Sequence, residues 1–206
     1  MTTNSDKLLL SEKIATKMCH DLSGTAMSVF NSLEMLKTGD SDDSFNKIAI
    51  DIATRGASGF SAKIKFFRIA FGSLGQNEID GVSLNTLMKN YLQSSFDKYE
   101  LSLTENLTLT AKEAKIIFSV IIFAMTVAMP GFKLSLSRSG NQIILEIKNP
   151  KDFIIPPELT ITDSDVRFAT LTPGNSPLFL GGMLAGEYGK NMKINIKGNS
   201  LLLLLQ

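Results

Sequence analysis

The chain has one cysteine and one histidine among its 206 residues, and this scarcity excludes several kinds of site. A single cysteine, Cys19, cannot form a disulfide within the chain. Protein zinc sites draw on several cysteine and histidine side chains, so one of each excludes a His/Cys metal site within one chain. We therefore expect neither a structural disulfide nor a bound metal of the protein's own.

Two other features are also missing: an excess of one charge and a long apolar run. Lys plus Arg is 21 and Asp plus Glu 20, a formal net charge of +1, without the basic excess typical of nucleic-acid binding. The most apolar window, 116–129, contains Ser119 and Thr126 and is shorter than the roughly 20 residues that cross a bilayer. Residues 1–7 lack the pattern of a signal peptide. We expect a cytoplasmic protein that binds neither nucleic acid nor membrane.

The single histidine lies within a regular apolar pattern. Taking heptad position d at Ala15 and a at Cys19 puts His20 at b, which faces away from the seam of a helical bundle. The pattern alternates steps of four and three residues, and its members are Ala15, Cys19, Leu22, Ala26, Val29, Leu33 and Leu36.

The side chains near His20 leave its imidazole uncovered. Ser23 and Gly24 lie one turn further on, and Lys13 and Lys17 lie one to two turns back. Glycine inside a helix lowers helix stability by about 1 kcal/mol relative to alanine. The presence of Gly24 in this helix therefore calls for an explanation, and clearing space for a partner at His20 is one. An ordinary surface histidine on an amphipathic helix is the alternative that the pattern leaves open.

Two long helices are predicted in the first third of the chain, over about 7–37 and 44–71, with Gly39 ending the first. Two copies of such an antiparallel hairpin can bury both apolar stripes as a dimeric four-helix bundle, so we expect a homodimer. Packing of the hairpin on the rest of its own chain is the alternative. The stripe of the second helix comprises Ala49, Ala53, Ala57, Phe60, Ile64, Phe67 and Phe71.

After a glycine-rich linker at 72–82, the pattern changes to shorter helices and alternating strands. Ser83 is a candidate helix cap, and Thr110 with Glu113 has capping-box spacing. Helices on one face of a mainly antiparallel sheet give an α+β sandwich, so the fold class is α+β with an N-terminal helical hairpin. The predicted helices are 84–92, 111–129 and 177–188, and the predicted strands are 101–104, 132–138, 142–149, 193–197 and 201–205.

The segment around His20 resembles a known phosphoacceptor helix. His20-Asp21-Leu22 followed by Gly24, then Asn31 and the run Leu33-Glu34-Met35-Leu36, is similar to that helix in the ChpT-type histidine phosphotransferases. The family has proline after the glycine where this chain has Thr25, which weakens the expected kink but not the chemistry. Further points of resemblance are the aromatic close at 66–72, the helix end at 128–131 and the segment 184–189.

The resemblance implies two domains. Residues 1–75 would form the dimerising hairpin that carries the histidine, and residues 76–206 an α/β domain similar to the ATP-binding domain of histidine kinases. The groups that hold ATP are missing, however: Ser119 stands where the metal-holding asparagine is expected, and Asn149-Pro150-Lys151-Asp152 is not followed by an Asp-x-Gly-x-Gly loop. Gly181-Gly182 lies within an apolar helix pattern, where helix packing is the expected use.

A histidine phosphotransferase without ATP receives phosphate from another phosphoprotein. The resemblance implies that His20 is the phosphoacceptor, with Asp21 beside it, and that phosphate passes between receiver domains of a hybrid histidine kinase and of response regulators. Magnesium would come from the receiver, so no cofactor is expected. Ser23 and Gly24 would contact the partner. Lys13 and Lys17, with Lys63 on the second helix as a further candidate, would complement the acidic pocket of a receiver. An ordinary solvated helix face is the alternative for each lysine. Such a protein is a phosphoryl carrier rather than an ATP-dependent kinase, which leaves its status as an enzyme open. The alternatives are a kinase that still uses ATP and a dimeric interaction module whose histidine is not phosphorylated.

Overall fold

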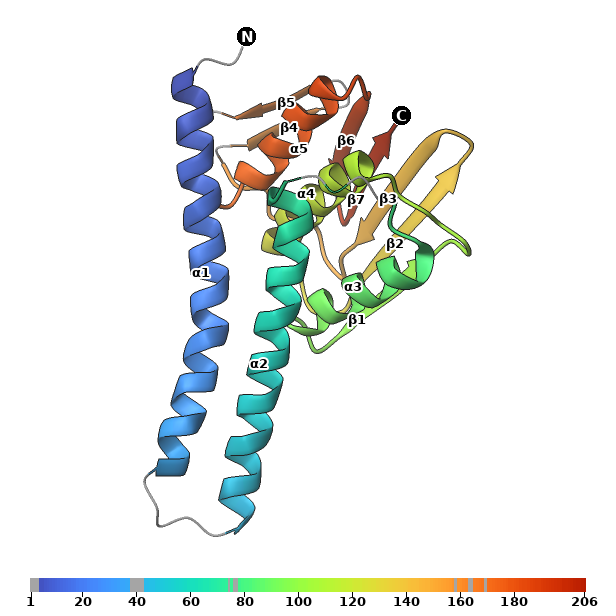
Figure 1. Cartoon of the computed structure of the whole chain (residues 1–206). Coiled ribbons are helices and arrows are strands. Elements are labelled where there is room, and N and C mark those ends of the chain that lie inside the picture. The colour runs from blue at the N-terminus through green and yellow to red at the C-terminus, as the bar shows by residue number, and fades with distance from the viewer. Residues whose placement is uncertain are drawn as a thin grey trace.

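The computed structural model describes residues 4–37, 43–73, 75, 78–157, 159–162, 165–168 and 170–206. These residues form a helical hairpin followed by an α/β layer, which confirms the α+β fold class (Figure 1). The order of elements is α1 (Asn4–Lys37), α2 (Asp43–Phe71), α3 (Gly81–Gln93), β1 (Tyr99–Leu103), α4 (Ala111–Val127), β2 (Phe132–Ser139), β3 (Gln142–Lys148), β4 (Leu159–Thr162), β5 (Asp165–Phe168), α5 (Ser176–Glu187), β6 (Met192–Lys197) and β7 (Ser200–Leu205).

The helices α1 and α2 run antiparallel and pack along one another, as the sequence predicts. The C-terminal end of α1 and the N-terminal end of α2 extend beyond the rest of the molecule (Figure 1). Gly39, which was expected to end the first helix, lies outside the described residues. The opposite half of the hairpin contacts α3, α4 and α5.

The main sheet has five strands in the order β1-β2-β3-β7-β6. Only β1 and β2 are parallel, and the other neighbours are antiparallel, so the mainly antiparallel sheet is confirmed. Gly140 and Gly198, each with φ of 57°, turn the two predicted hairpins, because glycine adopts positive φ at little cost. The short strands β4 and β5, which were not predicted, form a separate antiparallel sheet.

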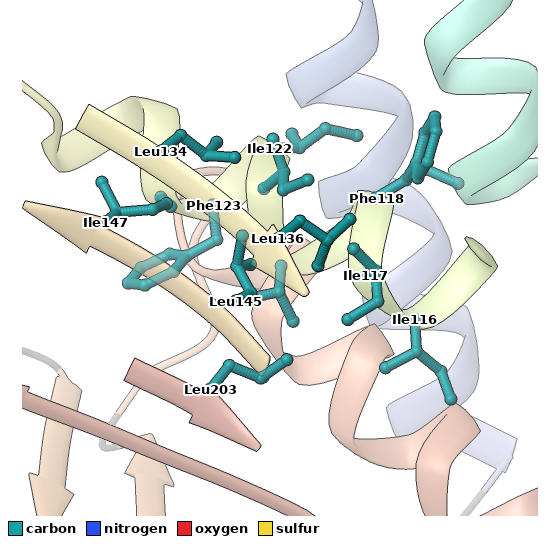
Figure 2. Packing of buried hydrophobic residues seen from close by; sticks show 14 of the residues in the cluster. Ile116, Ile117, Phe118, Ile122, Phe123, Leu134, Leu136, Leu145, Ile147 and Leu203 are labelled. Carbon is teal, nitrogen blue, oxygen red and sulfur yellow. The ribbon is translucent and has the colours of Figure 1, made fainter. Parts of the chain in front are cut away.

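The core lies between the sheet and α4. Every residue of α4 from Ile116 to Ala124 is buried, which explains why this segment is apolar all around rather than on one face. Alternate residues of β2, β3 and β7 point onto it, among them Leu136, Leu145 and Leu203 (Figure 2). Alternation in the strands follows from their two-residue period.

The C-terminal end of α2 belongs to the same core. Phe66 and Phe67 are 0% and 1% exposed. The Phe66 ring stacks on Tyr91 of α3 at a centroid distance of 3.8 Å and on Phe118 of α4 at 4.2 Å. The hairpin and the C-terminal α/β layer therefore share one apolar core.

The helix α3 begins earlier than predicted. Asp80, not Ser83, is its N-cap, and the Asp80 carboxylate accepts hydrogen bonds from the Ser83 backbone N–H at 2.9 Å and from its hydroxyl at 2.7 Å. The prediction of Ser83 as the cap was wrong because a carboxylate three residues earlier was available to accept from it. The predicted capping box of Thr110 and Glu113 at α4 is confirmed.

Glu113 also binds two cations inside the fold. Its carboxylate lies 2.8 Å from Arg138 of β2 and 3.2 Å from Lys190, and its side chain is 4% exposed. Burial raises the pKa of Glu113, but hydrogen bonds from Arg138, the Thr110 backbone and Lys190 outweigh it and lower this pKa to about 2. The ionised carboxylate thus joins α4 to the sheet and to the segment after α5.

We predict that Glu113 makes stability depend on acid pH. Because its pKa falls from 4.5 to about 2 on folding, its contribution is complete above pH 4.5 and is lost as pH falls toward 2. The free energy of unfolding should drop by roughly 3 kcal/mol across that window from this group. In urea titrations, Glu113→Gln should be destabilised at pH 7, and its difference from wild type should shrink as pH falls. Glu100→Gln is the control, because the Glu100–Lys133 pair is exposed and its loss should cost under about 1 kcal/mol. A difference between Glu113→Gln and wild type that is the same at every pH would contradict this role.

Candidate functional site

His20 lies near the middle of α1 with its side chain 86% exposed. Its Nδ1 is 3.2 Å from Oδ1 of Asp21, the next residue in the helix. When Nδ1 carries the proton, it donates to this carboxylate and Nε2 keeps a free lone pair. The ring is therefore oriented by one nitrogen and can react through the other.

Asp21 is fixed in turn by Lys17. The Lys17 Nζ is 2.9 Å from Oδ1 and 2.8 Å from Oδ2 of Asp21, one turn apart on the same helix. The Lys17 and Asp21 side chains are only 15% and 17% exposed. Lys17 is therefore held by its own helix neighbour and is largely shielded from solvent.

The small residues predicted near His20 do leave open space. An ideal Cβ placed on Gly24 meets no atom within 4 Å, so no packing contact in the described chain requires glycine there. Ser23 is exposed. Lys13 is only partly exposed and does not line the cleft beside His20.

Two other glycines have packing roles. A Cβ on Gly56 of α2 would lie 2.8 Å from Cγ2 of Val29, and a Cβ on Gly59 would lie 3.3 Å from Cβ of Ser94. These glycines let α2 approach α1 closely on one side and the residues after α3 on the other. Both glycines also line a cleft beside His20.

This cleft has a volume of about 550 Å³ and is formed by both parts of the chain. His20, Asp21 and Gly24 line it from α1, and Lys63 lines it from α2. The far wall comes from Gln93, Ser94 and Asp97, at and after the end of α3. This wall could not be predicted from the sequence, because no local pattern indicates that residue 94 packs beside residue 59.

Lys63 reaches across from α2 to α1. Its Nζ donates to Oγ1 of Thr25 at 2.9 Å and to the backbone carbonyl of Asp21 at 3.2 Å. Burial lowers the pKa of Lys63, the nearby Asp21 carboxylate raises it, and Lys17 lowers it further. Lys63 was only a secondary candidate in the sequence analysis, yet it is the lysine whose ammonium group lies in the cleft.

An apolar stripe runs along the hairpin on a different side. At roughly 100° of rotation per residue, His20 lies about a third of a turn around α1 from this stripe. Of the predicted seam of α1, four residues are exposed, whereas Leu22, Val29 and Leu36 are partly buried against the chain itself. On α2, residues 50, 57 and 64, which are spaced seven positions apart, are also exposed. We call this surface the seam face: Leu8, Ala15, Cys19, Ala26, Phe30 and Leu33 of α1 with Ile50, Ala57 and Ile64 of α2.

The residues that stand where a histidine kinase would hold its nucleotide have contacts within the fold. Ser119 is 0% exposed, and its hydroxyl donates to the Lys115 carbonyl at 2.8 Å. The Asn149 side chain accepts from the Met129 N–H at 3.2 Å and donates to the Val127 carbonyl at 3.3 Å, which ties the end of α4 to β3. A Cβ on Gly181 would lie 3.2 Å from Val120, so this glycine serves the packing of α5 on α4.

The described residues contain neither a candidate metal site nor a candidate membrane span. They contain no cluster of three or more His, Cys, Asp or Glu side chains arranged to hold a metal ion. None of their helices combines the length and the apolar character that crossing a bilayer requires.

A solved structure of a bacterial phosphotransferase has the same overall fold. It is 18% identical to this chain with a TM-score of 0.74, and the match covers 97% of this chain and 96% of that one. At this identity the likeness establishes the fold alone.

The histidine kinase AdeS of Acinetobacter baumannii gives a TM-score of 0.42 at 13% identity over 90% of this chain and 95% of that one. A histidine kinase domain from the blue-light activated kinase of Erythrobacter litoralis gives 0.44 at 13% identity over 96% and 91%. No family model and no curated protein matches the sequence.

The open space at Gly24 predicts a contrast between two glycines of the hairpin. Gly24→Leu should leave the free energy of unfolding unchanged or raise it by up to about 1 kcal/mol, since leucine favours helix and meets no neighbour. Gly56→Leu should lower it by about 1–3 kcal/mol, since its side chain would collide with Val29. Urea unfolding followed by circular dichroism measures both. Clear destabilisation by Gly24→Leu would mean that the glycine has a packing role after all.

Proposed function

We propose that this protein is a histidine phosphotransferase in which His20 carries phosphate between receiver domains and ATP takes no part. The observation that carries the proposal is the setting of the only histidine: a side chain 86% exposed, held through Nδ1 by Asp21, in a cleft beside a glycine with no packing role. The α+β fold with an antiparallel hairpin supports it, as does the likeness to a bacterial phosphotransferase.

The chemistry follows from the orientation of the imidazole. The donor is an aspartyl phosphate of a receiver domain, whose bound magnesium neutralises the phosphoryl oxygens. The lone pair on Nε2 of His20 attacks phosphorus in line, an N–P bond forms, and the P–O bond breaks with its electron pair leaving on the receiver carboxylate. Asp21 stabilises the positive charge that develops on the ring through its contact with Nδ1. The reverse steps deliver phosphate to a second receiver.

The lack of ATP chemistry is part of the proposal. Ser119 and Asn149 stand near the positions where a kinase would hold metal and adenine, and the side chains of both are hydrogen-bonded within the fold. This favours a carrier over the alternative of a kinase that still uses ATP.

The cleft indicates how a receiver would dock. Its walls come from the hairpin and from residues 93–97, so a partner seated at His20 would touch both parts of the chain. We propose a division near residue 75, with the hairpin presenting the histidine and residues 76–206 supplying the second wall. The partners are receiver domains of a hybrid kinase and of response regulators, in the cytoplasm.

The seam face provides the argument for a homodimer. Phe30 and Leu33 of α1 are 55% and 47% exposed, and Ile50 of α2 is 54% exposed. On each helix, the stripe lies about a quarter of a rotation around the helix axis from the position where Gly56 meets Val29, in the same rotational sense along the chain. Because the two helices are antiparallel, the two stripes lie on the same side of the pair. Two such faces would bury one another in a four-helix bundle and leave His20 open on each protomer.

Phosphoryl transfer to His20 is the central prediction. Incubation with a panel of phosphorylated receiver domains should label wild type with acid-labile phosphate and should leave His20→Ala unlabelled. Gly24→Leu should fold normally and still lose most labelling, because its side chain fills the space in front of the imidazole. Phosphate analysis at acid and alkaline pH separates phosphohistidine from phosphoserine.

Two outcomes would contradict this proposal. Labelling of wild type by magnesium-ATP alone, absent in His20→Ala, would show that the protein is a kinase. No labelling by any receiver in the panel, with a dimer still present, would favour a module whose histidine is not phosphorylated. A third outcome, equal labelling of Gly24→Leu and wild type, would overturn only the claim that the open space serves a partner.

The seam face predicts how the dimer can be broken. Phe30→Asp combined with Leu33→Asp should give a monomer, because charges buried in an apolar seam are strongly unfavourable. Met27→Asp is the matched control, since Met27 is 52% exposed on the same helix but lies off the stripe. Light scattering measures the mass of each. A dimer that survives the double change, or one that Met27→Asp disrupts equally, would place the interface elsewhere.

A further inference from the structure

Lys63 is a cation with an unusual set of partners. Its ammonium is half-buried and donates to a hydroxyl and a backbone carbonyl, both of them uncharged. Among the described residues, no carboxylate oxygen lies within ion-pair distance of it. Burial without a directly bonded counter-ion is the first cause of its lowered pKa.

The other cations around the cleft already have carboxylate partners. Lys17 binds both oxygens of Asp21. Arg55, which also lines the cleft, lies 2.6 Å from Asp51 one turn away. The remaining charged residue of the lining is Asp97, on the opposite wall. Lys63 is therefore the cation of this lining with the strongest electrostatic reason to accept a new anion.

A phosphoryl group on His20 would bring such an anion into the same cleft. One acceptor of Lys63 is the backbone carbonyl of Asp21, the residue that follows His20, so the ammonium already lies beside the helix turn that carries the imidazole. Its two present bonds are to neutral oxygens, which exchange readily for a charged phosphoryl oxygen because charge-assisted hydrogen bonds are stronger. Partial burial strengthens that attraction relative to a fully exposed lysine.

We infer that Lys63 contacts the phosphoryl group during transfer to and from His20 and stabilises its charge. The inference rests on the function proposed above and adds a residue from the second helix to the reaction. As the N–P bond forms and the receiver carboxylate leaves, the phosphoryl oxygens pass from the receiver's magnesium to Lys63. No proton needs to move, since lysine acts here as a fixed positive charge.

The test uses phosphoramidate, a small phosphoryl donor without a docking surface, alongside phosphorylated receiver domains. Lys63→Met keeps the length of the side chain and removes its charge, so it should slow labelling of His20 by about ten- to a hundredfold with either donor. Lys63→Arg should restore much of the rate, because the charge returns. Lys65→Met is the matched control: an exposed lysine on the same helix that does not line this cleft, and it should react like wild type.

The outcomes separate this inference from the function on which it rests. If wild type takes phosphate from neither donor, the proposed function fails. If wild type is labelled and Lys63→Met is labelled equally fast, only the role of Lys63 fails. If Lys63→Met and Lys63→Arg are equally slow and both unfold at lower urea concentration, then Lys63 is merely a tie between α2 and α1, which also overturns the inference.

Discussion

The stacking of Phe66 between Tyr91 and Phe118 is the contact on which the geometry of the molecule depends. It fixes the C-terminal half of α2 in the core of the α/β layer, with ring centroids 3.8 and 4.2 Å apart. Aromatic pairs in proteins typically contribute roughly 0.5–1.5 kcal/mol each beyond the area that they bury. Because α3 ends shortly after Tyr91, the same stack brings Ser94 close to Gly59, where an added Cβ would lie 3.3 Å from Cβ of Ser94. The wall of the cleft beside His20 is thus a consequence of core packing some distance from it.

The hairpin keeps its interactions on separate sides of two helices. One side of α1 packs on α2 through Val29 and Thr25, a second carries the apolar seam face, and a third presents His20. With 3.6 residues per turn, neighbours in sequence such as Cys19 and His20 point in directions roughly 100° apart. A dimer and a receiver could therefore bind the same stretch of helix at once, since neither would cover the surface that the other needs.

Much of this fold could be predicted from the sequence because its signals are local. The heptads of α1 and α2, the capping box at Thr110 and the glycine turns at Gly140 and Gly198 each depend on residues a few positions apart. The start of α3 was misplaced because Asp80 and Ser83 are both good caps and sequence alone does not say which accepts the bond. The strands β4 and β5 were missed because they are four residues each within a polar stretch. For the site, His20 and the space at Gly24 could be read directly, whereas the role of Lys63 and the wall at Ser94 depend on tertiary contacts across more than 30 positions.

The position of Lys17 shows why a residue type and a spacing do not determine a role. Lys17, three residues before His20, is the lysine closest to it along α1, and it was expected to face a partner. In the structure Lys17 forms an ion pair with Asp21, and the two side chains are 15% and 17% exposed. Lys17 therefore orients the Asp21 carboxylate, which in turn orients the His20 ring. Lys63 is 43 residues away in sequence, yet its ammonium lies against the backbone of the histidine's own helix turn. An ammonium that is already paired with a carboxylate gains little electrostatic stabilisation from a second anion. An ammonium bonded only to neutral oxygens gains the stabilisation of a new ion pair. The electrostatics of the cleft therefore favour the second helix, rather than the first, as the source of the positive charge that a phosphoryl group would meet.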